Sequence, residues 1–327
     1  MCTTRIKACA RPNPPPPFHC RGDLPGSRGA LAKGVDHPAA GRARDDEELD
    51  GLRASPAMTD VVTADDGLPA TKVGAWTREK HERLLKYVGI TRDVRRKFGN
   101  RTYIELFCGP GRSVIEDRGE FIDGSPILAA RTAKESSAPY TDIHVADFEP
   151  SYVEAVTKRL RDIASRVYPY TGPAEQTVNM ITSKLNPHGL HFAFLDPYKL
   201  DPLPFSIIET LAKFKRIDML IHVSIHDFQR NLRLYMDERD GPLDRFAPGW
   251  RSAVASRDRD KTARIKIFQH WLKLIRSLDM AASDGIELVS GSNKQPLYWL
   301  VLVARHERAH GFWNKIRDVS DQRRLPL

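Results

Sequence analysis

Short runs of apolar residues along the chain alternate with longer segments in which apolar residues recur every three or four positions. Short runs rich in β-branched and aromatic side chains predict strands, and the longer period predicts amphipathic helices. The predicted strands cover residues 102–107, 143–147, 178–182, 191–196 and 218–223. Helical patterns separate them, and one helix that starts near Trp76 precedes the first strand. Strands that alternate with helices predict an α/β fold with a parallel sheet.

The C-terminal part predicts a different ending for this sheet. Apolar residues recur at helical spacing over residues 261–278, and we expect a helical insertion at 225–280. Two strand-like runs follow at 286–290 and 297–304, and the short link between them cannot form a helical crossover, so they must pair antiparallel. A mainly parallel seven-stranded sheet with a terminal antiparallel hairpin is the Rossmann-like fold of class I S-adenosylmethionine (SAM) methyltransferases. We predict this fold.

The N-terminal residues have a different composition. Residues 1–75 contain a run of four prolines from Pro14 to Pro17, an acidic cluster at 45–50 and almost no periodic apolar positions. Such a segment cannot offset its own ordering entropy, so we predict a disordered low-complexity tail at 1–75 and a methyltransferase-like domain at 76–320. A more ordinary composition begins at Met58, which raises the hypothesis that translation starts there.

Composition narrows the class of protein. Apolar residues make up 41% and charged residues 28% of the chain, as in ordinary globular proteins. No secretory signal and no apolar run of membrane-spanning length is present, so we expect a cytoplasmic protein without a membrane span. The formal net charge is +9, and the positive excess lies beyond residue 70, which favours nucleic acid or another anion as a partner.

The cysteines give no sign of a metal site. Cys2, Cys9, Cys20 and Cys108 form no CxxC pair and have no histidine at metal-ligand spacing. We therefore expect no bound metal and interpret all four as incidental free thiols.

Candidate cofactor residues lie at the predicted strand ends. In doubly wound folds the ligand lies beyond the carboxyl ends of the strands. The first strand and the loop after it contribute Glu105, Phe107, Gly109, Pro110 and Gly111. Glycines let the backbone approach a cofactor closely, and the pattern departs from the dinucleotide GxGxxG. These residues predict SAM as the cofactor, although a simple tight turn at a strand end is the alternative.

An acidic residue ends the second predicted strand. Asp147 is placed to accept hydrogen bonds from ribose hydroxyls, as acids do in nucleotide-binding Rossmann units. Glu149 is the competing candidate two residues later. An ordinary solvated loop carboxylate is the alternative for either acid.

The loop after the fourth predicted strand carries candidate catalytic residues. Asp196, Pro197 and Tyr198 resemble the (Asp/Asn)-Pro-Pro-(Tyr/Phe) loop of methyltransferases that modify amino groups, but one proline is missing. By that resemblance Asp196 would orient the nucleophile, Tyr198 would stack on its ring, and Pro197 would line the substrate site. A purely structural turn is the alternative.

Polar residues also follow the fifth predicted strand, in the segment HVSIHDFQR. On a helix, His226 and Arg230 would share one face, where they could recognise a substrate. His222 and Asp227 lie in the same segment. Ordinary surface positions are the alternative interpretation.

Several separated segments together resemble one family, the three-Cys-motif partner proteins (TcmP), over residues 76–316. The matching segments are WTREKHERLLKYV, YIELFCGPGR with DGSPILAAR, HFAFLDPYKLDPL, DMLIHVSIHDFQRNL and YWLVLVARHERAHGFW. The resemblance implies a methyltransferase-like protein without an assigned substrate, encoded beside a radical-SAM-like protein that bears three cysteines. Those cysteines belong to the partner, so Cys2, Cys9 and Cys20 are not the motif that gives the family its name.

The sequence thus supports three functional hypotheses. The first is a SAM-dependent methyltransferase acting on a nitrogen or oxygen acceptor, with nucleic acid among the candidates. The second is a non-catalytic partner that serves as a scaffold for a three-Cys radical-SAM-like protein. The third is a nucleic-acid-processing accessory that holds phosphates through the basic helix at 261–276.

Overall fold

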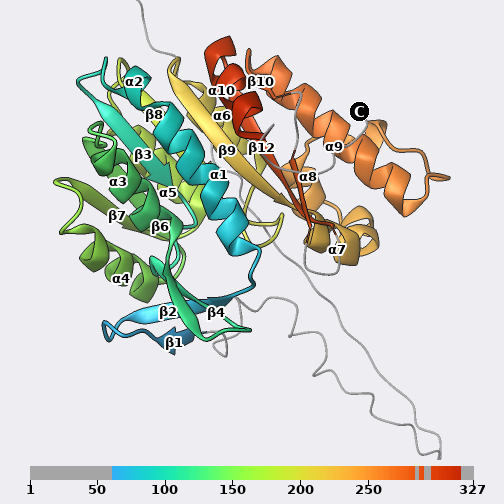
Figure 1. Ribbon diagram of the computed structural model, residues 1–327. Coiled ribbons are helices and arrows are strands. Elements are labelled where there is room, and N and C mark those ends of the chain that lie inside the picture. The colour runs from blue at the N-terminus through green and yellow to red at the C-terminus, as the bar shows by residue number, and fades with distance from the viewer. Residues whose placement is uncertain (1–60, 284–286, 291–295, 318–327) are drawn as a thin grey trace, which may run out of the picture. The chain divides into compact units, whose positions relative to one another are not determined.

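The central element is a sheet in which six strands follow the order β7-β6-β3-β8-β9-β12 (Figure 1). The computed structural model describes residues 61–283, 287–290 and 296–317. The strands are β3 (Arg101–Glu105), β6 (Asp142–Asp147), β7 (Val167–Thr171), β8 (Leu190–Leu195), β9 (Ile217–Ser224), β10 (Ala281–Ala282), β11 (Glu287–Ser290) and β12 (Pro296–Ala304). The first five run parallel, whereas β12 is antiparallel to β9, and β10 and β11 pair antiparallel with β12. The predicted parallel sheet with a terminal antiparallel hairpin is confirmed.

The predicted third strand is wrong. Residues 178–182 belong to helix α5 (Ala174–Thr182), in which Val178 and Ile181 are buried three positions apart on one face. The strand in this place is β7, whose sequence VYPYT contains Pro169. A proline removes one ladder hydrogen bond, and β7 tolerates this because it lies at the edge of the sheet.

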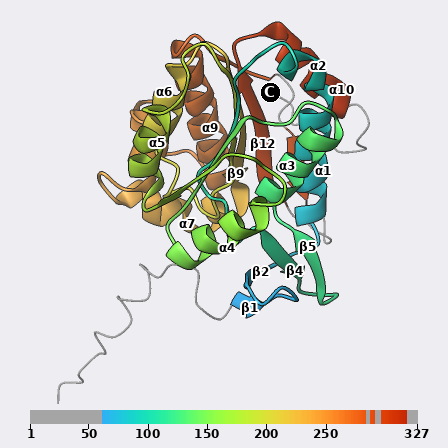
Figure 2. The same ribbon diagram turned by 90° about the vertical axis from the view of Figure 1, so that its left-hand side faces the viewer.

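Helices cover both faces of the sheet (Figure 2). One face carries α1 (Thr77–Ile90), α3 (Ser125–Glu135), α4 (Pro150–Leu160) and α10 (Glu307–Arg317). The other face carries α5, α6 (Phe205–Ala212), α7 (Ile225–Asp237), α8 (Pro242–Phe246) and α9 (Asp260–Ser277). Two apolar cores result, one on each side of the sheet. Among the helices of the described residues, none has both the length and the hydropathy to cross a bilayer.

A second, smaller sheet has the order β1-β2-β4-β5. Its strands are β1 (Val61–Thr63), β2 (Pro69–Val73), β4 (Arg112–Ile115) and β5 (Glu120–Asp123). Regular structure is thus present before Trp76, the predicted boundary, and the segment after Gly111 is a hairpin of β4 and β5. Local sequence did not predict β2 because it pairs in parallel with β4, which is distant in sequence. Residues 1–60 of the predicted tail lie outside the described residues.

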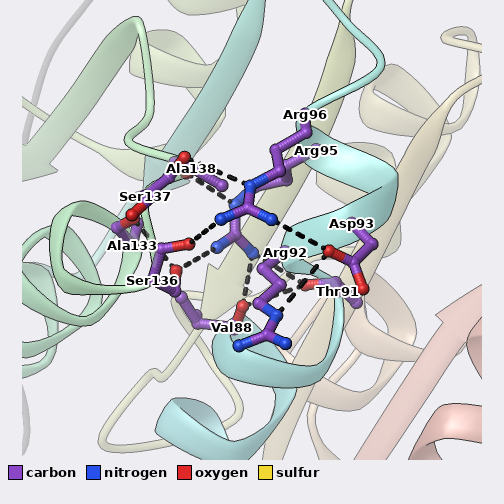
Figure 3. Close-up of polar contacts among 10 residues, drawn as sticks. All are labelled: Val88, Thr91, Arg92, Asp93, Arg95, Arg96, Ala133, Ser136, Ser137 and Ala138. Atoms are coloured by element: carbon purple, nitrogen blue, oxygen red, sulfur yellow. Dashed lines mark hydrogen bonds and ion pairs between the residues drawn. The ribbon is translucent and has the colours of Figure 1, made fainter.

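A buried arginine joins α1, the short helix α2 (Arg92–Arg95) and the end of α3 (Figure 3). The guanidinium of Arg95 donates to the carbonyl oxygens of Ala138 at 3.0 Å and Val88 at 2.5 Å. It also donates to the hydroxyls of Thr91 at 2.8 Å and Ser136 at 3.2 Å. One cation thus satisfies backbone and hydroxyl groups of two helices at once.

We predict that Arg95→Met lowers the free energy of unfolding by about 2–4 kcal/mol, because it leaves these buried acceptors without a donor. The neighbouring Arg96→Met is the matched control. Arg96 is exposed, so its loss is expected to cost less than about 1 kcal/mol. Urea denaturation followed by tryptophan fluorescence measures both. Equal losses in the two variants would contradict this account of the Arg95 contacts.

Candidate functional site

The glycine loop after β3 leaves room for a ligand. Gly109 and Gly111 have φ angles of +54° and +79°, in the left-handed region that favours glycine. A Cβ added to Gly111 would meet Cγ2 of Val156 at 2.8 Å, so this glycine is required by close packing on α4. A Cβ added to Gly109 would meet nothing within 4 Å. The loop therefore packs against α4 at Gly111 and faces open space at Gly109.

Asp147 lies beside this loop at the end of β6. Its Oδ2 accepts a hydrogen bond from the Gly109 amide at 2.8 Å, and its Oδ1 accepts one from the Glu149 amide at 3.2 Å. Burial raises the pKa of the Asp147 carboxyl above its ordinary value. The Glu149 carboxylate instead caps α4, because it accepts from the amide and hydroxyl of Ser151. Of the two competing acids, Asp147 is the one that contacts the glycine loop.

Glu105, at the end of β3, is completely buried. Its two carboxyl oxygens accept hydrogen bonds from Ser125 Oγ at 2.5 Å and Tyr103 OH at 2.6 Å. Burial raises its pKa well above the ordinary value, against the opposing effect of these two hydrogen bonds. Glu105 thus ties the end of β3 to the first residue of α3. Phe107 is half-buried and packs against the core formed with α5 to α9.

Arg159 on α4 joins the glycine loop to the small sheet. Its Nη1 donates to the carbonyl oxygens of Pro110 at 2.5 Å and Pro69 at 2.8 Å. Its other nitrogens bind the carboxylate of Asp66, and this ion pair lowers the pKa of Asp66 to about 2. Local sequence gives no sign of this role for Arg159, because its partners are scattered along the chain.

Asp196, directly after β8, forms a buried ion pair that the sequence analysis did not predict. Nζ of Lys80, on α1, lies 2.5 Å from Oδ2 of Asp196, and both side chains are at most 15% exposed. Burial alone would raise the pKa of Asp196, but the nearby Lys80 ammonium holds it below its ordinary value. A signal existed in the sequence: Lys80 lies one helical turn before the core residue Leu84, on the apolar face of α1.

Two buried histidines accompany this ion pair. Burial lowers the pKa of His81 to about 3 and that of His222 to about 4, and the Lys80 ammonium adds to both shifts. Nδ1 of His222 lies 3.1 Å from the Pro197 carbonyl oxygen and 3.4 Å from Oδ1 of Asp196. Because a carbonyl only accepts, Nδ1 carries the proton and Nε2 is the unprotonated nitrogen of the neutral ring.

The other predicted substrate residues do not join this cluster. Tyr198 is 77% exposed, and His226 and Arg230 are exposed one turn apart on α7. Within the described part of the chain, none of the three contacts Asp196 through a hydrogen bond or ion pair. Asp227 has a structural role instead, because its carboxylate accepts from the Leu200 amide at 2.9 Å and so fixes the loop that follows Asp196.

The cluster holds no arrangement suited to a metal ion. Over residues 61–283, 287–290 and 296–317, no group of three or more His, Cys, Asp or Glu side chains is placed to bind one. The Cys108 thiol is buried in the glycine loop, and burial raises its pKa well above the ordinary value. The titratable side chains gathered around Asp196 are Lys80, His81 and His222.

Comparison with known proteins gives structural likeness only. No protein-family model matches the chain, and no curated protein does. Among solved structures, an O-methyltransferase from Bacillus cereus in complex with SAH is similar, with 14% identity, a TM-score of 0.40, and coverage of 67% of this chain and 80% of that one. Trm1 from Pyrococcus horikoshii with S-adenosyl-L-methionine has 10% identity, a TM-score of 0.38, and coverage of 75% and 61%. The fold assignment rests on strand order, and the TcmP resemblance stays a prediction.

Because the pKa values of His81 and His222 are lowered in the folded protein, part of the free energy of unfolding depends on pH and is lost in acid. Between about pH 4 and 6.5 the unfolded chain protonates His81 and His222 while the folded chain does not, so their contribution to stability falls as the pH falls. Each contributes up to about 1.4 kcal/mol per pH unit. We predict that the difference in unfolding free energy between wild type and His81→Gln shrinks from pH 6.5 to pH 4.5.

Urea titrations at the two pH values measure this difference. His188→Gln is the control, because its side chain is exposed. If the wild-type advantage over His81→Gln is the same at both pH values, the neutral state of buried His81 is refuted.

Proposed function

We propose that this protein is a SAM-dependent methyltransferase that acts on a nitrogen or oxygen acceptor. The observation that carries the proposal is the glycine loop at the end of β3, which is open above Gly109 and bound through the Gly109 amide to the carboxylate of Asp147. The loop and the acid lie at the ends of adjacent parallel strands, β3 and β6, where doubly wound folds bind their ligands.

The residues present fit SAM. The space above Gly109 admits an adenosyl group close to the backbone, and Asp147 accepts hydrogen bonds from ribose hydroxyls. When bound, SAM supplies a methyl group activated by its sulfonium sulfur. Glu105 acts through Ser125 and Tyr103 by fixing the loop, since both of its oxygens are already engaged.

Asp196 lies beyond β8, next to β3 on the side opposite β6, and thus on the acceptor side of the loop. Its ionised carboxylate can accept a hydrogen bond from an N–H or O–H of the acceptor and so orient the nucleophile. Lys80 keeps this carboxylate charged. The excess of basic residues beyond position 70 supports an anionic acceptor such as nucleic acid.

Isothermal titration calorimetry with SAM and S-adenosylhomocysteine tests the proposal. We expect wild type to bind both, and Asp147→Asn to bind at least about tenfold more weakly, because the loss of a charged hydrogen-bond acceptor costs about 1.5–3 kcal/mol. Glu149→Gln is the matched control and should bind as wild type does, since its carboxylate caps α4. Absence of binding by both compounds would refute the proposal.

Two observations favour a second candidate, a non-catalytic partner of a three-Cys radical-SAM-like protein. The carboxylate of Asp196 is already paired with Lys80, and Tyr198 lies exposed rather than beside Asp196. Such a protein would keep the fold and lose turnover. Co-purification of the tagged chain with its neighbouring three-Cys protein tests this candidate. It predicts equal recovery with wild type and Asp196→Asn, and failure of wild type to recover the protein rejects it.

A further inference from the structure

A cavity of about 310 Å³ lies at the amino ends of β8 and β9. His191 lines it from the start of β8, and Asp218 from the start of β9. The end of α1, together with α2 and α10, closes the other side (Figure 1). The glycine loop lies at the opposite ends of the strands, and β8 alone is roughly 20 Å long. The cavity is therefore separate from the proposed cofactor cleft.

Aromatic side chains form much of the cavity wall. The rings come from Tyr87, Phe98, Tyr140, Phe192 and Phe312. Tyr87 and Phe192 are buried, with ring centroids 5.1 Å apart. Walls of this kind suit a planar ring, and the volume is at the lower end of the roughly 300–1,000 Å³ of small-molecule sites.

One partly buried group in this wall, the Asp218 carboxylate, is an acceptor with capacity to spare. Oδ2 of Asp218 accepts from Tyr87 OH at 2.8 Å, while Oδ1 has no hydrogen-bond partner among the described residues. An unpaired acceptor at such a position favours a ligand with N–H donors. His191 is not a second acceptor of this kind, because it pairs with Ile217 across β8 and β9 and its side chain therefore lies on the sheet face opposite Asp218, against Phe214.

Basic side chains line the cavity as well, and they fall into two groups. Arg95 and Arg305 donate to protein oxygens, Arg95 as Figure 3 shows and Arg305 to the carbonyls that end α6. Lys97, Lys215 and Arg308 are exposed, and their side chains form no ion pair with any described residue. Three cations without an acidic partner at one cavity favour an anionic ligand.

We propose that this cavity is a nucleotide-binding site. A base with N–H donors lies against the aromatic rings and donates to the carboxylate of Asp218, and its phosphate faces Lys97, Lys215 and Arg308. Guanine fits this acceptor well, because its N1 and N2 present adjacent N–H donors to a carboxylate. The nucleotide is either free or part of a single-stranded RNA, since both offer the same base and phosphate.

Calorimetry on the full chain with GMP, guanosine and purine riboside 5′-monophosphate tests the site. We expect GMP to bind, guanosine to bind at least tenfold more weakly without its phosphate, and the purine riboside to bind at least tenfold more weakly without N–H donors on its base. Asp218→Asn should weaken GMP binding at least tenfold. Lys215→Gln should weaken it several-fold, whereas Lys213→Gln, two residues away and outside the cavity, should leave it unchanged.

A short guanosine-containing oligoribonucleotide distinguishes the two sources. Tighter binding of the oligonucleotide than of GMP, with displacement by GMP, assigns the site to RNA, whereas binding of GMP alone assigns it to a free nucleotide. The proposal is overturned if neither probe binds at millimolar concentration, or if Asp218→Asn and Lys215→Gln bind GMP as wild type does. Measurement of SAM affinity on the same samples keeps this outcome separate from that of the cofactor cleft.

Discussion

The buried ion pair between Lys80 and Asp196 is the interaction on which the candidate site depends, because a buried carboxylate needs a nearby cation to stay ionised. The fold brings the ends of β3, β6 and β8 to one edge of the sheet, and each strand ends in or just before a buried or partly buried carboxylate. Burial favours the protonated form of every such group. Asp196 is the exception, because the ammonium of Lys80, on the helix that precedes the sheet, lowers its pKa and keeps it ionised. The site thereby contains buried carboxyl groups whose pKa values are shifted in opposite directions.

This difference in pKa bears on the proposed chemistry. Glu105 accepts two hydrogen bonds and so stabilises the loop, and burial raises its pKa well above the ordinary value. The neutral histidines around the pair add no positive charge that would compete with Lys80. Asp196 is the carboxylate at this edge whose pKa lies below its ordinary value, whereas burial raises the pKa of Glu105 and of Asp147. Under the proposed function, the contact that stabilises the fold here therefore also keeps ionised the group that would orient a nucleophile.

Much of the fold followed from local sequence, and the exceptions have physical causes. The strands at 102–107, 143–147, 191–196 and 218–223 are buried apolar runs, so composition alone reveals them. β7 was missed because Pro169 interrupts it, and β2 was missed because it pairs with distant β4, while β1 is a short strand that, among the described residues, pairs only with β2.

The residues of the candidate site also fall into two groups, those that the local sequence indicated and those that it did not. Gly109 and Asp147 were predicted to line one site, and the Gly109 amide donates to Asp147 because adjacent parallel strands end at the same edge of the sheet, whereas Gly111 packs on α4. Lys80 and Arg159 were not singled out, since a cation on a helix usually lies in solvent and its partners here are distant in sequence. Tyr198 was expected beside Asp196 from a motif with one proline missing, and it lies exposed.

A crystal structure of the protein with S-adenosylhomocysteine tests the central claim most directly. The account predicts the adenosyl group over Gly109, the ribose hydroxyls within hydrogen-bond distance of Asp147, and the sulfur directed toward Asp196 with the Lys80 ion pair intact. A ligand bound away from the glycine loop, or one whose ribose does not contact Asp147, would contradict it.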